Sequence, residues 1–148
     1  MSHVGAMDSI KAHYNRLLRP ITREFGAFAP ATITSIVGFS AGGPVSLLRV
    51  TGRWVYVTCE LSFYSEQKAS TEGIQFELLS RQIQDESTVI STLTALGNLS
   101  MNAQLGDGHT VDVSGAVAAS RPAIIKLRLY SKLGFLRPRY GVYEVLSQ

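Results

Sequence analysis

The longest alternation of apolar and polar residues runs from Trp54 to Phe63 and predicts a β-strand. One side of this strand carries mainly apolar residues: Val55, Val57, Cys59, Leu61 and Phe63. The opposite side mixes aromatic and polar residues: Trp54, Tyr56, Thr58, Glu60 and Ser62. A second alternation follows the polar loop 65–72 and predicts a strand over Ile74–Arg81. We expect these two strands to pair antiparallel, each with one buried face.

Apolar residues recur at helical spacing in two segments, which predict two helices. The first segment covers residues 10–25, and Pro20 predicts a kink or a break inside it. The second covers residues 86–97, begins at the cap Asp85, and leaves a continuation past Gly97 open. Shorter apolar runs predict five further strands, at residues 31–37, 45–50, 110–113, 122–129 and 140–146. This order of elements predicts an α+β fold, with a mainly antiparallel sheet packed by two or so helices.

Length and composition favour one folded domain over residues 8–148. The chain has 148 residues, of which 45% are hydrophobic and 17% are charged, enough apolar side chains for a core. No apolar run approaches the ~20 residues that span a membrane. Residues 1–7 resemble a cloning remnant or a disordered tail and lack the apolar stretch of a signal peptide. The single cysteine, Cys59, excludes an internal disulfide. The lack of a signal-peptide stretch and the single cysteine together predict a cytoplasmic protein.

Charge is spread unevenly along the chain. Residues 1–53 carry six basic and two acidic groups, a net charge of +4. Residues 54–112 carry two basic and eight acidic groups, a net charge of −6, and residues 113–148 carry six basic groups and one acidic group, a net charge of +5. Two interpretations stay open. Either the segments pack so that their charges intermix, or one of them forms a patch that steers a partner of opposite sign.

Candidate metal ligands and nucleophiles are few. The three histidines, His3, His13 and His109, lie far apart in sequence and form no known metal motif, so we expect no metal and no cofactor. A nucleophilic pair of Cys59 and His109 is conceivable. However, Cys59 lies on the apolar side of its predicted strand, where a cysteine behaves as an inert small hydrophobe.

Two further patterns have a catalytic and a structural interpretation. Glu60 and Glu77 lie on neighbouring predicted strands, where they would form a carboxylate pair, but we expect them to be hydrated, solvent-facing side chains. The glycines of residues 41–44 lack the lysine and the helix of a phosphate-binding loop, so they predict a hairpin turn. We therefore expect no enzymatic activity.

A basic stretch near the C-terminus suggests nucleic-acid binding as one alternative function. Residues 121–139 carry all six basic groups of the segment 113–148, interleaved with the aromatic residues Tyr130 and Phe135 and followed by Tyr140. No recognised nucleic-acid-binding signature accompanies them, and the acidic middle segment opposes a positive field over the whole surface.

The block from Trp54 onward resembles the suppressor-of-fused domain family. The matching pieces are WVYVTCELSFY at 54–64, GIQFELLSR at 73–81, a helix with a late Gly-Asn-Leu-Ser, and LGDGH at 105–109. The closing strand 140–147 fits the family weakly. Glu60 stands where the family commonly has glycine, and the loop before Gly73 is short. The larger animal relative clamps a peptide between two domains, and this chain has no room for the second.

The resemblance implies a binding module without catalytic activity or cofactor. Stand-alone bacterial members of the family are similar to immunity proteins of polymorphic toxin systems, which neutralise a cognate toxin in the cytoplasm. We therefore expect a protein toxin, such as a nuclease, as the partner. We expect binding through aromatic and acidic residues: Trp54, Tyr56, Glu60, Tyr64, Glu66, Glu72 and Glu77. The alternative, from a different binding class, is a peptide-binding adaptor or scaffold domain that captures a strand at a sheet edge.

Overall fold

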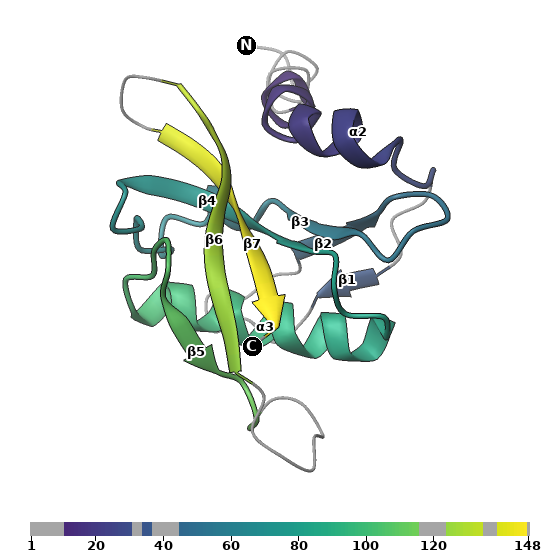
Figure 1. Cartoon of the computed structure of the whole chain (residues 1–148). Coiled ribbons are helices and arrows are strands. Elements are labelled where there is room, and N and C mark those ends of the chain that lie inside the picture. Colours follow the sequence, from purple (N-terminus) through teal and green to yellow (C-terminus); the bar gives the residue numbers. More distant parts are fainter. Residues whose placement is uncertain (1–10, 31–33, 37–44, 116–123, 135–138, 148) are drawn as a thin grey trace.

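A single mixed sheet of seven strands organises the protein (Figure 1). The computed structural model describes residues 11–30, 34–36, 45–115, 124–134 and 139–147. In chain order, the strands are β1 (Thr34–Ile36), β2 (Val45–Arg49), β3 (Tyr56–Cys59), β4 (Ile74–Ser80), β5 (Thr110–Asp112), β6 (Ile124–Leu133) and β7 (Arg139–Ser147). Their order across the sheet is β1-β2-β3-β4-β7-β6-β5. The predicted α+β class is confirmed, and the sheet is mixed, because β4 and β7 run parallel while the other pairs are antiparallel.

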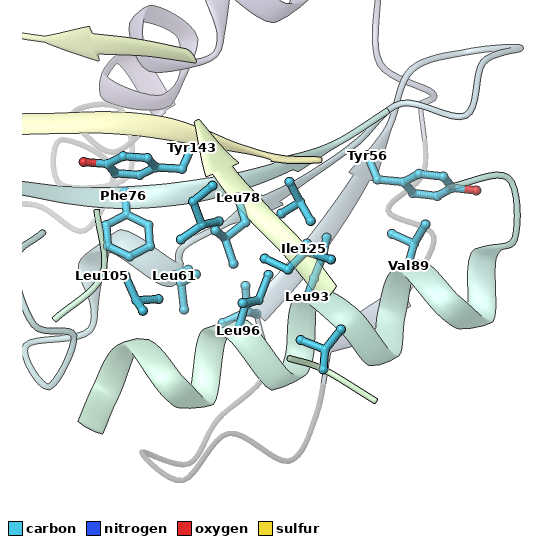
Figure 2. Packing of buried hydrophobic residues seen from close by; sticks show 14 of the residues in the cluster. Tyr56, Leu61, Phe76, Leu78, Val89, Leu93, Leu96, Leu105, Ile125 and Tyr143 are labelled. Carbon is cyan, nitrogen blue, oxygen red and sulfur yellow. The ribbon is translucent and has the colours of Figure 1, made fainter. Parts of the chain in front are cut away.

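Helix α3 (Glu86–Asn102) covers one face of the sheet. It begins at the predicted cap Asp85, whose carboxylate accepts a 3.1 Å hydrogen bond from the Thr88 N–H. The side chains of Leu93 and Leu96 point from α3 toward the sheet and pack in the same buried cluster as Leu78 (Figure 2). The helix is longer than the predicted 86–97, because favourable burial of its apolar side continues past the glycine at position 97.

Two short helical segments cover the other face (Figure 1). Residues 11–17 form the first, and α2 (Arg19–Phe25) follows after a turn at Leu18. Pro20 lies in the first turn of α2, where its missing N–H is not needed by the helix, which confirms the predicted break. The buried side chains of Leu17 and Ile21 belong to a second apolar cluster together with residues of β3, β4 and β7.

The predicted strand Trp54–Phe63 is wrong in its second half. Strand β3 ends at Cys59, Glu60 takes the left-handed backbone angle φ of 85°, and the 3-10 helix η1 (Leu61–Phe63) follows. This reversal brings Leu61 into the cluster on the α3 face, whereas Val57 lies in the cluster on the opposite face. Alternation alone did not reveal the turn, because the apolar residues after Glu60 continue the same spacing.

The loop 65–72 hydrogen-bonds to the part of β4 that β3 does not reach. Strand β3 pairs with Leu79 and Ser80 at the end of β4. Farther back along β4, the side chain of Gln67 donates to the Phe76 carbonyl at 3.0 Å and accepts from the Phe76 N–H at 2.9 Å. The buried amide of Gln67 thus takes the place of a neighbouring strand at this position.

The remaining sequence predictions hold with shifted ends. The strands predicted at 45–50, 110–113, 122–129 and 140–146 correspond to β2, β5, β6 and β7, and β6 extends to Leu133 past an irregularity between Leu129 and Ser131. Strand β1 lies within the predicted 31–37. The predicted turn around residues 41–44 and the tail 1–7 lie outside the described residues.

Candidate functional site

The carboxylate of Glu77, on the central strand β4, is completely buried. Its Oε1 accepts hydrogen bonds from the Thr58 hydroxyl at 2.8 Å and from the Leu61 N–H at 3.2 Å. Its Oε2 accepts from the Ser62 N–H at 2.8 Å, from the Ser62 hydroxyl at 2.5 Å and from the Tyr14 hydroxyl at 2.9 Å. The expectation that Glu77 faces solvent is therefore wrong. Three of the five donors come from residues 61 and 62, just after the left-handed turn.

Burial dominates the electrostatics of Glu77. Loss of hydration raises the pKa of this carboxyl group to about 7, although the hydrogen bonds from Ser62, Thr58 and Tyr14 pull it downward. Three of the donors are hydroxyl groups, and a hydroxyl can also accept a hydrogen bond. The pocket around Glu77 can therefore satisfy both its ionised and its protonated form.

The turn that donates to this carboxylate also carries an exposed aromatic ring. We call the set Glu60, Phe63, Tyr64 and Glu66 the acidic-aromatic surface. The Phe63 side chain is 41% exposed, and Glu60 and Glu66 are exposed as well. Glu60, Phe63 and Tyr64 line an open hollow of about 250 Å³. Two backbone hydrogen bonds close the turn, from the Phe63 N–H to the Glu60 carbonyl and from the Tyr64 N–H to the Leu61 carbonyl, both at 3.2 Å.

Aromatic rings support Phe63 from the side of the N-terminal helix. The His13 ring stacks on Phe63 with centroids 5.3 Å apart, and Tyr14 meets Phe63 edge to face at 5.1 Å. Tyr140, on β7, meets His13 at 4.5 Å. Burial, and then the positive charge of Arg16, lower the pKa of His13, so this ring packs as a neutral aromatic group at neutral pH. Sequence reasoning missed Phe63, because it placed this residue on the apolar side of a strand.

The seven residues predicted to bind a partner separate into different places. Glu60 and Tyr64 line the same hollow, and the exposed Glu66 follows Tyr64 by two positions in the chain. Trp54 precedes β3, at its other end, where it is 39% exposed and lies under the Arg49 guanidinium at 4.7 Å.

Tyr56 and Glu77 are fully buried, so the prediction that they contact a partner at the surface is wrong. The Tyr56 ring lies in the cluster on the α3 face (Figure 2), and its hydroxyl reaches Glu86 Oε1 at 3.4 Å. Tyr56 lies on the mixed aromatic and polar side of the predicted strand, and α3 covers this residue.

Glu72, the last of the seven, holds the LGDGH segment in place. Its Oε1 accepts hydrogen bonds from the Tyr143 hydroxyl at 2.5 Å and from the Asp107 N–H at 2.9 Å. Burial opposes ionisation, but the hydrogen bonds from Tyr143, Thr71 and Asp107 outweigh it and lower the pKa of Glu72. A Cβ atom on Gly106 would lie 1.8 Å from Thr71 Oγ1, so this position requires glycine. These contacts give Glu72 a structural role.

A second buried carboxylate, Glu144 on β7, is neutralised by arginine. Arg81 and Arg128 both form ion pairs with Glu144, and Arg81 also reaches Glu24 of α2 at 3.3 Å. Among the described residues, no lysine or arginine forms such an ion pair with Glu77. The cost of burying a carboxylate is therefore offset by opposite charge at Glu144 and by neutral hydrogen-bond donors at Glu77.

The described basic residues of β6 share this strand with Tyr130, whose ring packs near α2. Lys126, Arg128 and Lys132 are exposed on this strand. The Tyr130 hydroxyl donates to Glu24, and the Tyr130 ring packs near Phe25 with centroids 6.5 Å apart. The other aromatic residue of the stretch, at position 135, lies outside the described residues. The described part of this stretch thus offers exposed charge without an exposed aromatic platform.

The described candidate metal ligands and the candidate nucleophile Cys59 lie in different parts of the structure. No group of three His, Cys, Asp or Glu side chains among them is arranged to hold a metal ion. Burial, and then Glu77 and Glu60, raise the pKa of the half-buried Cys59 to about 12, so its thiol stays protonated. In the sheet, three strands lie between β3, which ends at Cys59, and β5, which begins just after His109. Cys59 and His109 therefore do not form a pair.

Among the residues that the structure describes, no helix is long and apolar enough to cross a membrane.

Comparison of the chain with protein-family models, with curated proteins and with solved structures found no match.

Proposed function

We propose that this chain is a non-catalytic protein-binding domain, and specifically an immunity protein that binds and neutralises a cognate bacterial toxin in the cytoplasm. The observation that carries the proposal is the exposed ring of Phe63 next to the carboxylate of Glu60 on one turn. Aromatic side chains are the commonest energetic anchors of protein interfaces, and a polar rim around them excludes water. The acidic-aromatic surface has both features.

The conformation of Glu60 supports the proposal and the family resemblance behind it. At φ 85° a glycine is unstrained, and glycine is what the suppressor-of-fused family commonly has at this position. A glutamate there costs roughly 1 kcal/mol of backbone strain. Strained residues cluster at functional sites, where the side chain offsets the cost. In this chain the strained residue is acidic, exposed and part of the lining of the hollow.

Charge supports the type of partner. A toxin that cleaves nucleic acid needs a basic substrate groove, and an acidic inhibitor surface accelerates association with such a groove. Glu60 and Glu66 bring two exposed negative charges close to Phe63 along the chain. We therefore propose a nuclease, or another toxin with a basic active-site surface, as the partner.

The direct test is binding of the purified chain to the toxin-like product of a neighbouring gene. We expect a stoichiometric complex that blocks the toxin's activity. Phe63→Ala should weaken affinity at least tenfold, whereas Trp54→Ala, which removes another exposed aromatic ring at the far end of β3, should change it less than twofold. Tight binding by Phe63→Ala would place the interface elsewhere, and no inhibition by the parent chain would reject the immunity function.

A peptide-binding adaptor is the second candidate, favoured by one feature of the sheet. Strand β5 lies at the edge of the sheet, has only three residues, and pairs with β6 on one side. A partner strand added to this edge would bind through backbone hydrogen bonds. N-methylation of the ligand backbone would then abolish binding, whereas Phe63→Ala would leave it unchanged.

A further inference from the structure

The hollow beside Phe63 has the size and chemistry for one side chain. Its volume of about 250 Å³ is below the roughly 300–1,000 Å³ of sites that enclose small-molecule ligands. Its described lining consists of Glu60, Phe63 and Tyr64, an acidic residue and two aromatic residues, and includes no described lysine or arginine. A carboxylate beside aromatic faces fits a cation on an apolar stem, which makes an ion pair with the acid and a cation–π contact with a ring.

Glu77 holds the backbone turn that carries the lining residues Glu60 and Phe63. The two residues between Glu60 and Phe63 are Leu61 and Ser62, and the backbone N–H groups of both donate to the Glu77 carboxylate. The Ser62 hydroxyl donates to it as well, at 2.5 Å. One buried carboxylate thus determines the path of the backbone that presents Glu60 on one side and Phe63 on the other.

The same carboxylate ties the N-terminal helix to the hollow. The Tyr14 hydroxyl donates to Glu77 at 2.9 Å, while the Tyr14 ring packs against Phe63. Tyr14 is not among the described residues that line the hollow. A change at the Tyr14 hydroxyl therefore acts on the hollow through Glu77 and through helix placement, and not by removing a ligand contact.

We propose that the hollow receives a lysine or arginine side chain of the partner, and that buried Glu77 is the positioning residue that keeps the hollow in shape. The inference rests on the proposed function for the existence of a partner protein. Its chemistry can be tested without that partner, because a free amino-acid derivative carries the same cation. Binding of such a probe can therefore be measured whether or not the chain binds a toxin.

The first experiment titrates the ¹⁵N-labelled chain with Nα-acetyl-arginine amide and follows its amide resonances. The uncharged probe Nα-acetyl-citrulline amide, of nearly the same shape, is the control. An exposed ion pair and a cation–π contact are both weak, so we expect a dissociation constant on the order of tens of millimolar. We expect saturable shifts at residues 60–64 with the arginine probe, and shifts at least threefold smaller with citrulline.

Matched charge variants decide whether the response is local. Glu60→Gln should remove the preference for arginine over citrulline. Asp112→Asn removes one negative charge from the exposed surface of β5, at the edge of the sheet, and should leave the preference unchanged. Equal shifts from the two probes, an absence of shifts at residues 60–64, or an equal loss in both variants would overturn the cation site.

The positioning role of Glu77 must be tested with a variant that still folds. In Glu77→Gln, the side-chain NH₂ group would face backbone N–H donors with no acceptor between them, which endangers folding. The test therefore uses Tyr14→Phe. We expect this variant to reduce the arginine-induced shifts at least threefold and to accelerate amide exchange of Phe63 and Tyr64 at least tenfold. Tyr143→Phe removes another buried hydroxyl, one that donates to Glu72 and lies near Ser70, and should leave both measurements within twofold of the parent.

Parent-like behaviour of Tyr14→Phe, or equal losses in both tyrosine variants, would overturn the role of Glu77. A normal arginine response in a chain that inhibits no toxin would reject the immunity function and would leave the cation site standing.

Discussion

The hydroxyl of Tyr14 donates a 2.9 Å hydrogen bond to Glu77, across 63 positions of sequence. This bond joins the first helical segment to the central strand of the sheet. Both groups are buried, so neither can exchange this bond for water without opening the layer between helix and sheet. The acidic-aromatic surface lies over this junction and depends on it.

Removal of the Tyr14 hydroxyl should destabilise the fold. Hydrogen bonds to buried charged groups contribute about 1.5–3 kcal/mol, so we expect Tyr14→Phe to lower the free energy of unfolding by about 2 kcal/mol. Tyr130→Phe removes a hydroxyl that donates to exposed Glu24, which water can solvate instead, and should cost less than 1 kcal/mol. Urea denaturation of both variants measures the difference, and equal costs would contradict the special role of the buried pair.

Stability should depend on pH through Glu77. Folding raises the pKa of this group from 4.5 to about 7, so between these values the folded state holds a proton that the unfolded chain has released. The contribution of Glu77 to the free energy of unfolding is thus greatest below pH 4.5, decreases by roughly 2–4 kcal/mol as pH rises to 7, and is constant above it.

Other groups near Glu77 act outside this window or with the opposite sign. Tyr14 and Cys59 have raised pKa values and titrate at alkaline pH. His13 has a lowered pKa, so its contribution increases as pH rises toward 6.5. The Glu77 carboxyl carbon resonance of the folded parent isolates this group, and urea denaturation of the parent from pH 4.5 to 8 measures the change in stability. A Glu77 resonance that titrates below pH 4.5 would contradict the prediction, as would a free energy of unfolding that does not fall over this range.

Position 60 should show a conflict between stability and binding. Glu60→Gly relieves the left-handed strain and should raise the free energy of unfolding by about 1 kcal/mol. Glu60→Ala keeps the strain and should leave stability unchanged. Both remove the carboxylate from the hollow, so both should weaken toxin binding and the arginine response to the same extent. Thermal unfolding together with a binding assay tests this, and a Glu60→Gly variant less stable than Glu60→Ala would contradict it.

The turn at Gly106 should tolerate no side chain. Its added Cβ would overlap Thr71 Oγ1, so we expect Gly106→Ala to cost about 1–3 kcal/mol. Gly115→Ala adds the same methyl group where nothing lies within 4 Å and should be neutral. A second substitution, Thr71→Gly, removes the overlapping atom, and the double-mutant cycle should recover part of the loss at Gly106. No recovery would mean that the backbone itself excludes a side chain there.

Loss of one of the two arginines that neutralise Glu144 should lower the free energy of unfolding. Arg81→Met leaves this buried carboxylate with Arg128 alone, and we expect a loss of about 2–4 kcal/mol. Glu144→Gln in the same chain removes the uncompensated charge and should restore at least 1 kcal/mol. Denaturation of the single and double variants measures this coupling. Additive losses would mean that Arg81 stabilises the fold through its contact with Glu24.

Local signals in the sequence determined the elements of this fold with few errors. Asp85 caps α3, Pro20 separates the two N-terminal helical segments, and Ile74–Ser80 forms β4 as its alternation predicted. Each of these features depends on backbone chemistry within a few residues, so a short window of sequence contains the cause.

The candidate site depended on contacts between distant segments. An acidic residue in an alternating strand predicts exposure, yet Glu77 is buried because donors from residues 14, 58, 61 and 62 surround it. Phe63 continued an apolar pattern, yet it is exposed because the chain turns at Glu60. Sequence alone determined the helices, most of the strands and the fold class. Only the tertiary structure decided which carboxylates face the interior, because the hydrogen bonds that make their burial possible come from segments that meet only in the folded chain.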